Sequence, residues 1–181
     1  MNSVAKNKTM KTIILITVTL LFTFISNAQD LGKIDADVQK QIGASLTTYY
    51  RLKNSLVASN SEIASQRADE LSKTFDAVDV SKMTEAQKTA WGKLEKLLRL
   101  DAKHINENKD LEHQRGHFMK LSNNMYALVF NFKANETEAY LQYCPMKKAS
   151  WLSDSKDIRN PYYGDKMLDC GSVKATLKKN K

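Results

Sequence analysis

The residues best suited to chemistry are two cysteines near the C-terminus, each with a methionine close by. Cys144 begins the triplet Cys144-Pro145-Met146, and Met167 precedes Cys170 by three positions. Two thiolates and two thioethers form a soft ligand set, which selects Cu(I) or Ag(I) over calcium or magnesium. The cysteines do not form a C-x-x-C pair, which disfavours thioredoxin-like exchange and zinc-ribbon spacing. The pattern therefore makes the four sulfur-containing residues candidate ligands of a soft metal ion.

A disulfide between the same two cysteines is the alternative. In an oxidising compartment two cysteines usually pair, and closing this loop would contribute about 3.5 kcal/mol in the chain-entropy model. An oxidised pair offers no thiolates to a metal. A Cys144–Cys170 disulfide and a metal site at these residues therefore exclude each other, and the sequence leaves both open.

Histidine is the other candidate ligand type. His113 and His117 are four positions apart, so on a helix both rings project from one face. The residue after His113 is Gln114, so this is not the H-E-x-x-H zinc motif. We expect His117 to be half-buried and hydrogen-bonded to the C-terminal segment, with His113 and His104 facing solvent.

Catalytic motifs are missing from the sequence. It contains no G-x-S-x-G, no phosphate-binding glycine loop and no H-E-x-x-H, and six glycines leave little from which to build an oxyanion hole. We therefore expect no enzymatic activity. The enzyme alternative is a Cys144 nucleophile with His117 as its base.

The N-terminus has the pattern of a secretory signal. Three lysines precede an uncharged run from Thr12 to Ile25, and small residues follow up to Ala28. The run is too short for a bilayer, which needs roughly 20 apolar residues. We predict a signal peptide at residues 1–28, export to the periplasm, and a mature chain that does not span the membrane.

The charge balance does not indicate a nucleic-acid partner. The chain carries 28 basic and 20 acidic residues, and removing three signal-peptide lysines would lower the net charge from +8 to +5. The basic residues are scattered except for a C-terminal cluster, which we interpret as a solvated, frayed tail. Its members are Lys174, Lys178, Lys179 and Lys181.

The rest of the chain predicts long helices. Only six Gly and two Pro occur, and apolar residues recur at helical spacing in four stretches. Capping residues are expected at Ser59 with Glu62, at Thr84 with Gln87, and at Asp110. We predict a mainly α, up-and-down bundle of about four helices, with stretches near residues 34–56, 63–75, 91–105 and 111–132.

The C-terminal segment, residues 136–173, differs from the helical part. A short strand-like run at residues 140–144 precedes turn formers and aromatics, with no helical stripe between the cysteines. Such a segment cannot bury a core alone, so we expect it to pack on the bundle through Trp151, Tyr162 and Tyr163. Arg115 could clamp its backbone. Residues 29–181 would then form a single domain.

This segment contains four short sequence motifs that occur together with a fifth motif upstream, at residues 114–122. The combination resembles a secreted bacterial domain of unknown function, found alone or at the C-terminus of heavy-metal efflux adaptors of the copper/silver-exporting RND type. The resemblance is good over residues 111–173 and looser over the helices. The strings are QRGHFMKLS (114–122), YCPM (143–146), WLS (151–153), IRNPYYG (158–164) and MLDCG (167–171).

The resemblance implies a helical protein with a cysteine-bearing C-terminal segment that handles soft metals in the periplasm. Its motif residues at matching positions are His117, Cys144, Met146, Met167 and Cys170. This chain departs from the family in a short link at residues 147–149, where two lysines would repel a cation unless they point to solvent.

Together these observations lead us to expect a non-enzymatic, periplasmic Cu(I)- or Ag(I)-binding protein of heavy-metal efflux or homeostasis. Its partner would be an efflux adaptor or another periplasmic protein. The alternative is a disulfide-stabilised periplasmic interaction module without a metal.

Overall fold

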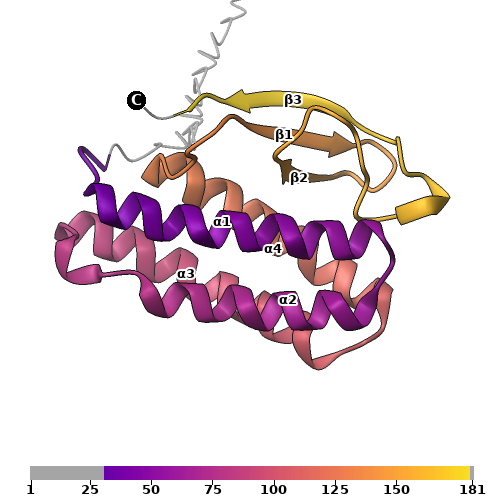
Figure 1. Ribbon diagram of the computed structural model, residues 1–181, viewed down its shortest axis with the longest axis horizontal. Coiled ribbons are helices and arrows are strands. Elements are labelled where there is room, and N and C mark those ends of the chain that lie inside the picture. Colours follow the sequence, from indigo (N-terminus) through magenta and orange to yellow (C-terminus); the bar gives the residue numbers. More distant parts are fainter. Residues whose placement is uncertain (1–30, 180–181) are drawn as a thin grey trace, which may run out of the picture.

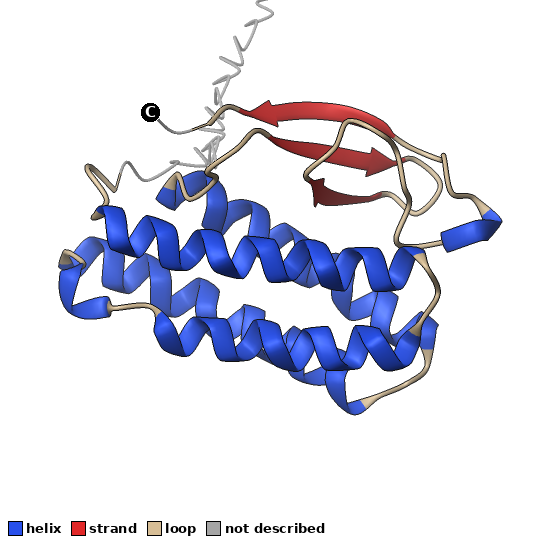
Figure 2. Ribbon diagram, viewed as in Figure 1, coloured by secondary structure: helices blue, strands red, loops and turns tan. Residues whose placement is uncertain are grey.

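Four helices form the body of the protein. The computed structural model describes residues 31–179, so the predicted signal peptide at residues 1–28 lies outside the described part. The helices pack as an up-and-down bundle, and a small sheet covers one side of it (Figures 1 and 2). The predicted mainly α bundle is confirmed, with α1 at Ala36–Val57, α2 at Ser61–Thr74, α3 at Glu85–Glu107 and α4 at Leu111–Phe132.

Local side-chain caps begin the helices at these positions. Thr84 and Gln87 form the predicted capping box at α3, and the Asp110 carboxylate accepts the His113 N–H at α4. The prediction of Ser59 as the α2 cap is wrong, because Asn60 accepts the Ile63 N–H instead. Ser59 has a φ of 53° in the α1–α2 turn, whereas an N-cap residue needs an extended backbone.

The C-terminal segment forms a three-stranded antiparallel sheet in the order β2-β1-β3, with β1 at Ala139–Cys144, β2 at Ala149–Ser153 and β3 at Ser172–Leu177. Only β1 was predicted from the sequence. Lys174 lies in β3, with its ammonium 5.6 Å from the Tyr143 ring centroid, so the expectation of a frayed tail is wrong there. This stretch is ordered because it hydrogen-bonds to the second edge of β1.

The sheet packs on α1 and α4 through buried aromatic residues. The Tyr49 ring of α1 stacks on Phe118 of α4, with centroids 5.3 Å apart. Its hydroxyl lies 2.8 Å from Ser122 Oγ and accepts the Leu152 N–H of β2 at 3.1 Å. Trp151 and Tyr162 are fully buried. The predicted packing of this segment on the bundle is therefore confirmed for these two aromatics.

Arg115 clamps the loop before β3, as predicted. Its buried guanidinium donates from Nε to the Pro161 carbonyl at 2.9 Å. Nη2 donates to the Leu56 carbonyl at 3.1 Å and to Ser59 Oγ at 3.0 Å. One side chain of α4 thus joins the α1–α2 turn to the C-terminal segment.

Among residues 31–179, no helix is long and apolar enough to cross a membrane.

We predict that Arg115→Lys destabilises the protein by roughly 2–4 kcal/mol, because an ammonium cannot reproduce the fork of three hydrogen bonds. Thermal unfolding followed by circular dichroism should show a Tm lower by about 5–15 °C. Arg159→Lys is the matched control, since Arg159 is exposed. Equal Tm values for the two variants would contradict the clamp.

Candidate metal centres

The two cysteines meet at one end of the sheet. Tyr143 of β1 pairs with Ser172 of β3, so the last residue of β1 lies opposite the residues that lead into β3. The Cys144 and Cys170 Sγ atoms are 3.3 Å apart. Pairing of β1 with β3 therefore brings together two thiols that are separated by 25 residues in the sequence.

The Sγ···Sγ distance of 3.3 Å is longer than a disulfide bond and shorter than the separation of two sulfurs that bind one metal ion. A disulfide bond is about 2.05 Å long, and two sulfurs on one tetrahedral metal are about 3.8 Å apart at a metal–sulfur distance of about 2.3 Å. From 3.3 Å, the sulfurs would have to move closer to form a disulfide and slightly apart to share a metal ion. The free thiols can thus oxidise to a disulfide or ligate one ion.

Hydrogen bonds favour ionisation of one of the two thiols. Burial opposes ionisation of Cys144, but hydrogen bonds from the Lys147 N–H, the Cys170 thiol and the Asn160 amide outweigh it and lower the Cys144 pKa. The Lys147 N–H lies 3.4 Å from its sulfur. The pKa of Cys170 is raised, first because its thiol hydrogen-bonds to Cys144. Cys144 is therefore the more acidic thiol of the pair.

The methionines flank this pair. Met146 is 64% exposed in the turn after β1, and Met167 is half-buried, with its carbonyl accepting the Cys170 N–H at 3.1 Å. Lys147 is directed to Glu112, with 3.7 Å between Nζ and Oε2, and Lys148 is exposed. One lysine is thus paired with a carboxylate and the other faces solvent, which removes the main electrostatic objection to a cation at the thiols.

His117 lies with the other histidines rather than with the cysteines. The potential ligand atoms of His104, His113 and His117 all lie within 4.8 Å of one another, and within residues 31–179 no other group of three His, Cys, Asp or Glu ligands is this close. His117 stacks on His104 of α3, with ring centroids 4.3 Å apart. We call these residues the histidine triad.

Two expectations about the histidines are corrected by this arrangement. His117 Nδ1 lies 2.9 Å from Asp101 Oδ1 of α3, so its partner is not the C-terminal segment. His104 and His113 are half-buried in the triad rather than free in solvent. The reason is the short link between α3 and α4, which folds the end of one helix against the start of the next. The short gap between the helical stretches predicted at residues 91–105 and 111–132 was the signal that could have revealed this.

The nucleophile–base pair of the enzyme alternative is not assembled. The Cys144 sulfur hydrogen-bonds to the Cys170 thiol and the Lys147 N–H, whereas His117 bonds to Asp101.

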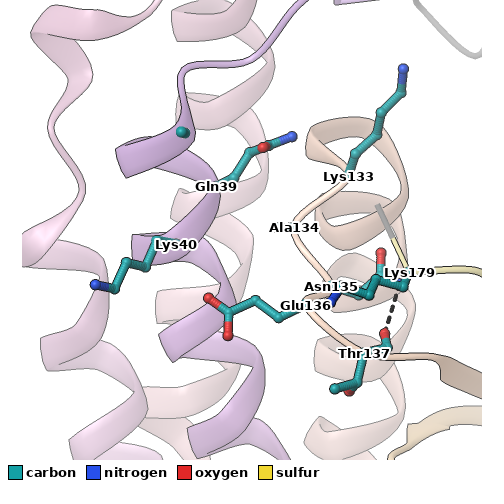
Figure 3. Close-up of a pocket in the computed structure, with 9 residues that line it drawn as sticks. Gln39, Lys40, Lys133, Ala134, Asn135, Glu136, Thr137 and Lys179 are labelled. Atoms are coloured by element: carbon teal, nitrogen blue, oxygen red, sulfur yellow. Dashed lines mark hydrogen bonds between the residues drawn. The ribbon is translucent and has the colours of Figure 1, made fainter. Parts of the chain in front are cut away.

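An open pocket of about 510 Å³ lies between the start of α1 and the residues after α4. Lys40, Lys133, Lys179 and Glu136 are among its lining residues. Figure 3 shows the Lys40 and Lys133 side chains extending away from one another rather than converging on a common point. The pocket therefore offers no assembled anion site, and its lining includes neither cysteine nor histidine.

The fold and these two clusters define a helical-bundle protein with ligand-type side chains at two separate places. The comparison with protein families matches residues 46–137 to the family described as Protein of unknown function (DUF3347). The chain belongs to this family. Searches of curated proteins and of solved structures found no match. The matched residues include the whole histidine triad, whereas both cysteines lie after them.

We predict that mild oxidation of the reduced protein closes an intramolecular Cys144–Cys170 disulfide, because the two sulfurs are already 3.3 Å apart. Mass spectrometry should show the loss of two hydrogens without dimer formation. The oxidised form should be more stable to denaturant by about 3.5 kcal/mol, from loop closure. Intermolecular disulfides as the main product would contradict the adjacency of the thiols.

Proposed function

We propose that this protein is a periplasmic, non-enzymatic soft-metal-binding protein that takes up Cu(I) or Ag(I) at Cys144 and Cys170. The observation that carries the proposal is the 3.3 Å separation of the two Sγ atoms. A pair of thiolates is the ligand set that soft monovalent ions prefer, and binding here would serve delivery or buffering in heavy-metal efflux.

The ionisation behaviour of the pair supports this chemistry. Thiolates rather than thiols bind metal, and binding releases their protons. The lowered pKa of Cys144, produced by N–H and thiol hydrogen bonds against the opposing effect of burial, makes it the thiol that would lose its proton first. The proton shared between the two sulfurs would leave as the ion enters, and Cys170 would become the second ligand.

The methionines would complete the coordination. The backbone N–H of Met146 hydrogen-bonds to both cysteine sulfurs, so its side chain starts next to the thiol pair. A thioether on an unbranched side chain with three rotatable bonds adapts readily to an ion. Met167 lies in the turn that ends at Cys170, where its carbonyl accepts the Cys170 N–H.

The location and partner belong to the same proposal. The N-terminal lysines and apolar run support export. The resemblance to domains on copper/silver efflux adaptors supports a periplasmic partner of that kind. We propose that the exported chain meets an efflux adaptor or another periplasmic metal-handling protein.

A disulfide-stabilised interaction module without metal is the second candidate function. The adjacency of the sulfurs favours it equally. The burial of Trp151 and Tyr162 weighs against it, because these aromatics fill the core rather than forming a surface for a partner.

We expect the reduced protein to bind one Cu(I) ion in competition with a Cu(I)-specific chelator. Cys144→Ser and Cys170→Ser should each lower the affinity by about 100-fold or more, since each removes a thiolate ligand. Met146→Leu and Met167→Leu should cause smaller losses. Met119→Leu is the matched control, because Met119 packs against the bundle core. Unchanged stoichiometry and affinity in both serine variants would rule out the proposed site.

A thiol assay on freshly purified, unreduced protein from the periplasm separates the two candidates. Two free thiols, or thiols protected by bound copper, are expected for the metal-binding protein. Protein that contains neither free thiol nor metal, and that loses thermal stability on reduction, would support the interaction module instead.

A further inference from the structure

The structure assigns a second metal site to the histidine triad: we propose that His104, His113 and His117 bind a borderline divalent cation such as Zn²⁺. This site is independent of the thiol pair and goes beyond the proposed soft-metal function. Imidazole nitrogens suit Zn²⁺ and related ions, whereas two thiolates suit monovalent copper or silver. The two centres would therefore select different ions.

The first argument is convergence. The chain contains three histidines, and all three lie in this one cluster although they come from two helices. The ring centroids of His113 and His117 are 4.7 Å apart, and those of His104 and His113 are 6.1 Å apart. Two imidazole nitrogens on one tetrahedral zinc are about 3.4 Å apart. Modest ring rotations would bring ligand atoms that already lie within 4.8 Å to that spacing.

The second argument is the orientation of His117 by a buried carboxylate. Asp101 is 5% exposed and lies one turn before His104 on α3. Its Oδ1 lies 2.9 Å from His117 Nδ1. A carboxylate on one ring nitrogen fixes the tautomer and leaves the other nitrogen for a metal, as in many zinc sites. Asp101 is thus a positioning residue for the proposed ion.

The third argument is the state of the other two rings. Within residues 31–179, the rings of His104 and His113 contact histidine rings and have no side-chain hydrogen bond. All three histidines are half-buried. An ion can therefore reach the three rings from solvent and coordinate ring nitrogens of His104 and His113 that have no other side-chain partner among the described residues, and a fourth position would remain for water.

The site lies away from the thiols because of helix geometry. Arg115, which binds the C-terminal segment, precedes His117 by two positions, and this spacing corresponds to about 200° around the helix axis. The two side chains consequently point to nearly opposite sides of α4. An ion held by the triad would cross-link α3 to α4, a contact that does not depend on the sheet.

The test uses Zn²⁺ alone as the probe, with Co²⁺ as its spectroscopic substitute. The protein carries Cys144→Ser and Cys170→Ser, or is fully oxidised, so that no thiolate can compete. We expect one ion to bind, a tetrahedral Co²⁺ absorption spectrum, and an increase in Tm with added zinc. His104→Gln should lower zinc affinity by about 100-fold or more and abolish the Tm increase, because the remaining ligands lie on α4 alone. Lys103→Gln, an exposed neighbour, is the matched control.

The role of Asp101 has its own readout. Asp101→Asn should lower zinc affinity about 10-fold and change the tautomer of the His117 ring, observed by nitrogen NMR of the imidazoles. A purely structural role would leave the zinc affinity unchanged, whatever the tautomer of the His117 ring.

NMR of the unsubstituted, oxidised protein needs no histidine variant. Three histidines give three sets of ring signals, and zinc should shift all three at one equivalent. Shifts confined to His113 and His117, or equal zinc affinity in the His104→Gln and Lys103→Gln proteins, would overturn the three-histidine site. Loss of Cu(I) binding at the cysteines would not affect this result, so the two proposals fail separately.

Discussion

The Arg115 guanidinium lies almost completely out of solvent, and a buried cation must have its N–H groups hydrogen-bonded to be tolerated there. Its acceptors are the Pro161 and Leu56 carbonyls and the Ser59 hydroxyl. This requirement fixes the α1–α2 turn and the loop after β2 against α4. It also leaves little room at Gly164, where an added Cβ would lie 2.9 Å from Arg115 Nη2 and 2.5 Å from Ser59 Oγ. Cys170 follows Gly164 by six residues, so the Arg115 hydrogen bonds hold the loop that leads to Cys170.

Helix α4 divides the molecule into two chemical regions. One side packs against the sheet and indirectly supports the thiol pair, while the other carries two of the three triad histidines against α3. The side-chain types differ in the same way, with the sulfur atoms at one end of the sheet and the imidazole nitrogens between α3 and α4. Residues 46–137, which match the family, contain the triad and the helices that support it. The two proposed centres, a pair of thiols and a histidine triad, would suit metal ions of different classes.

The four helices could be read from the sequence because their signals are local. Apolar periodicity depends on which residues lie three or four positions apart, and the caps at Thr84 and Asp110 depend on neighbours within one turn. The clamp at Arg115 was also predicted, because a guanidinium can bind the backbone carbonyls of an irregular segment. The errors arise where a nearby alternative competes. Ser59 could have capped α2, but the turn places it in a left-handed conformation and uses its hydroxyl for Arg115.

The sequence by itself determined the helical class, the segment on which the sulfur ligands lie, and the residue types available for coordination. Only the tertiary structure decided which of those residues meet. Strand β3 has a weak pattern of its own and is ordered by pairing with β1, and this pairing places Cys170 beside Cys144. The hairpin of α3 and α4 likewise brings His104 to His113 and His117. Both convergences depend on hydrogen bonds and packing between separate elements. The spacing of residues gives no sign of the first, and the short break between the two helices indicates only that His104 and His113 could lie near each other.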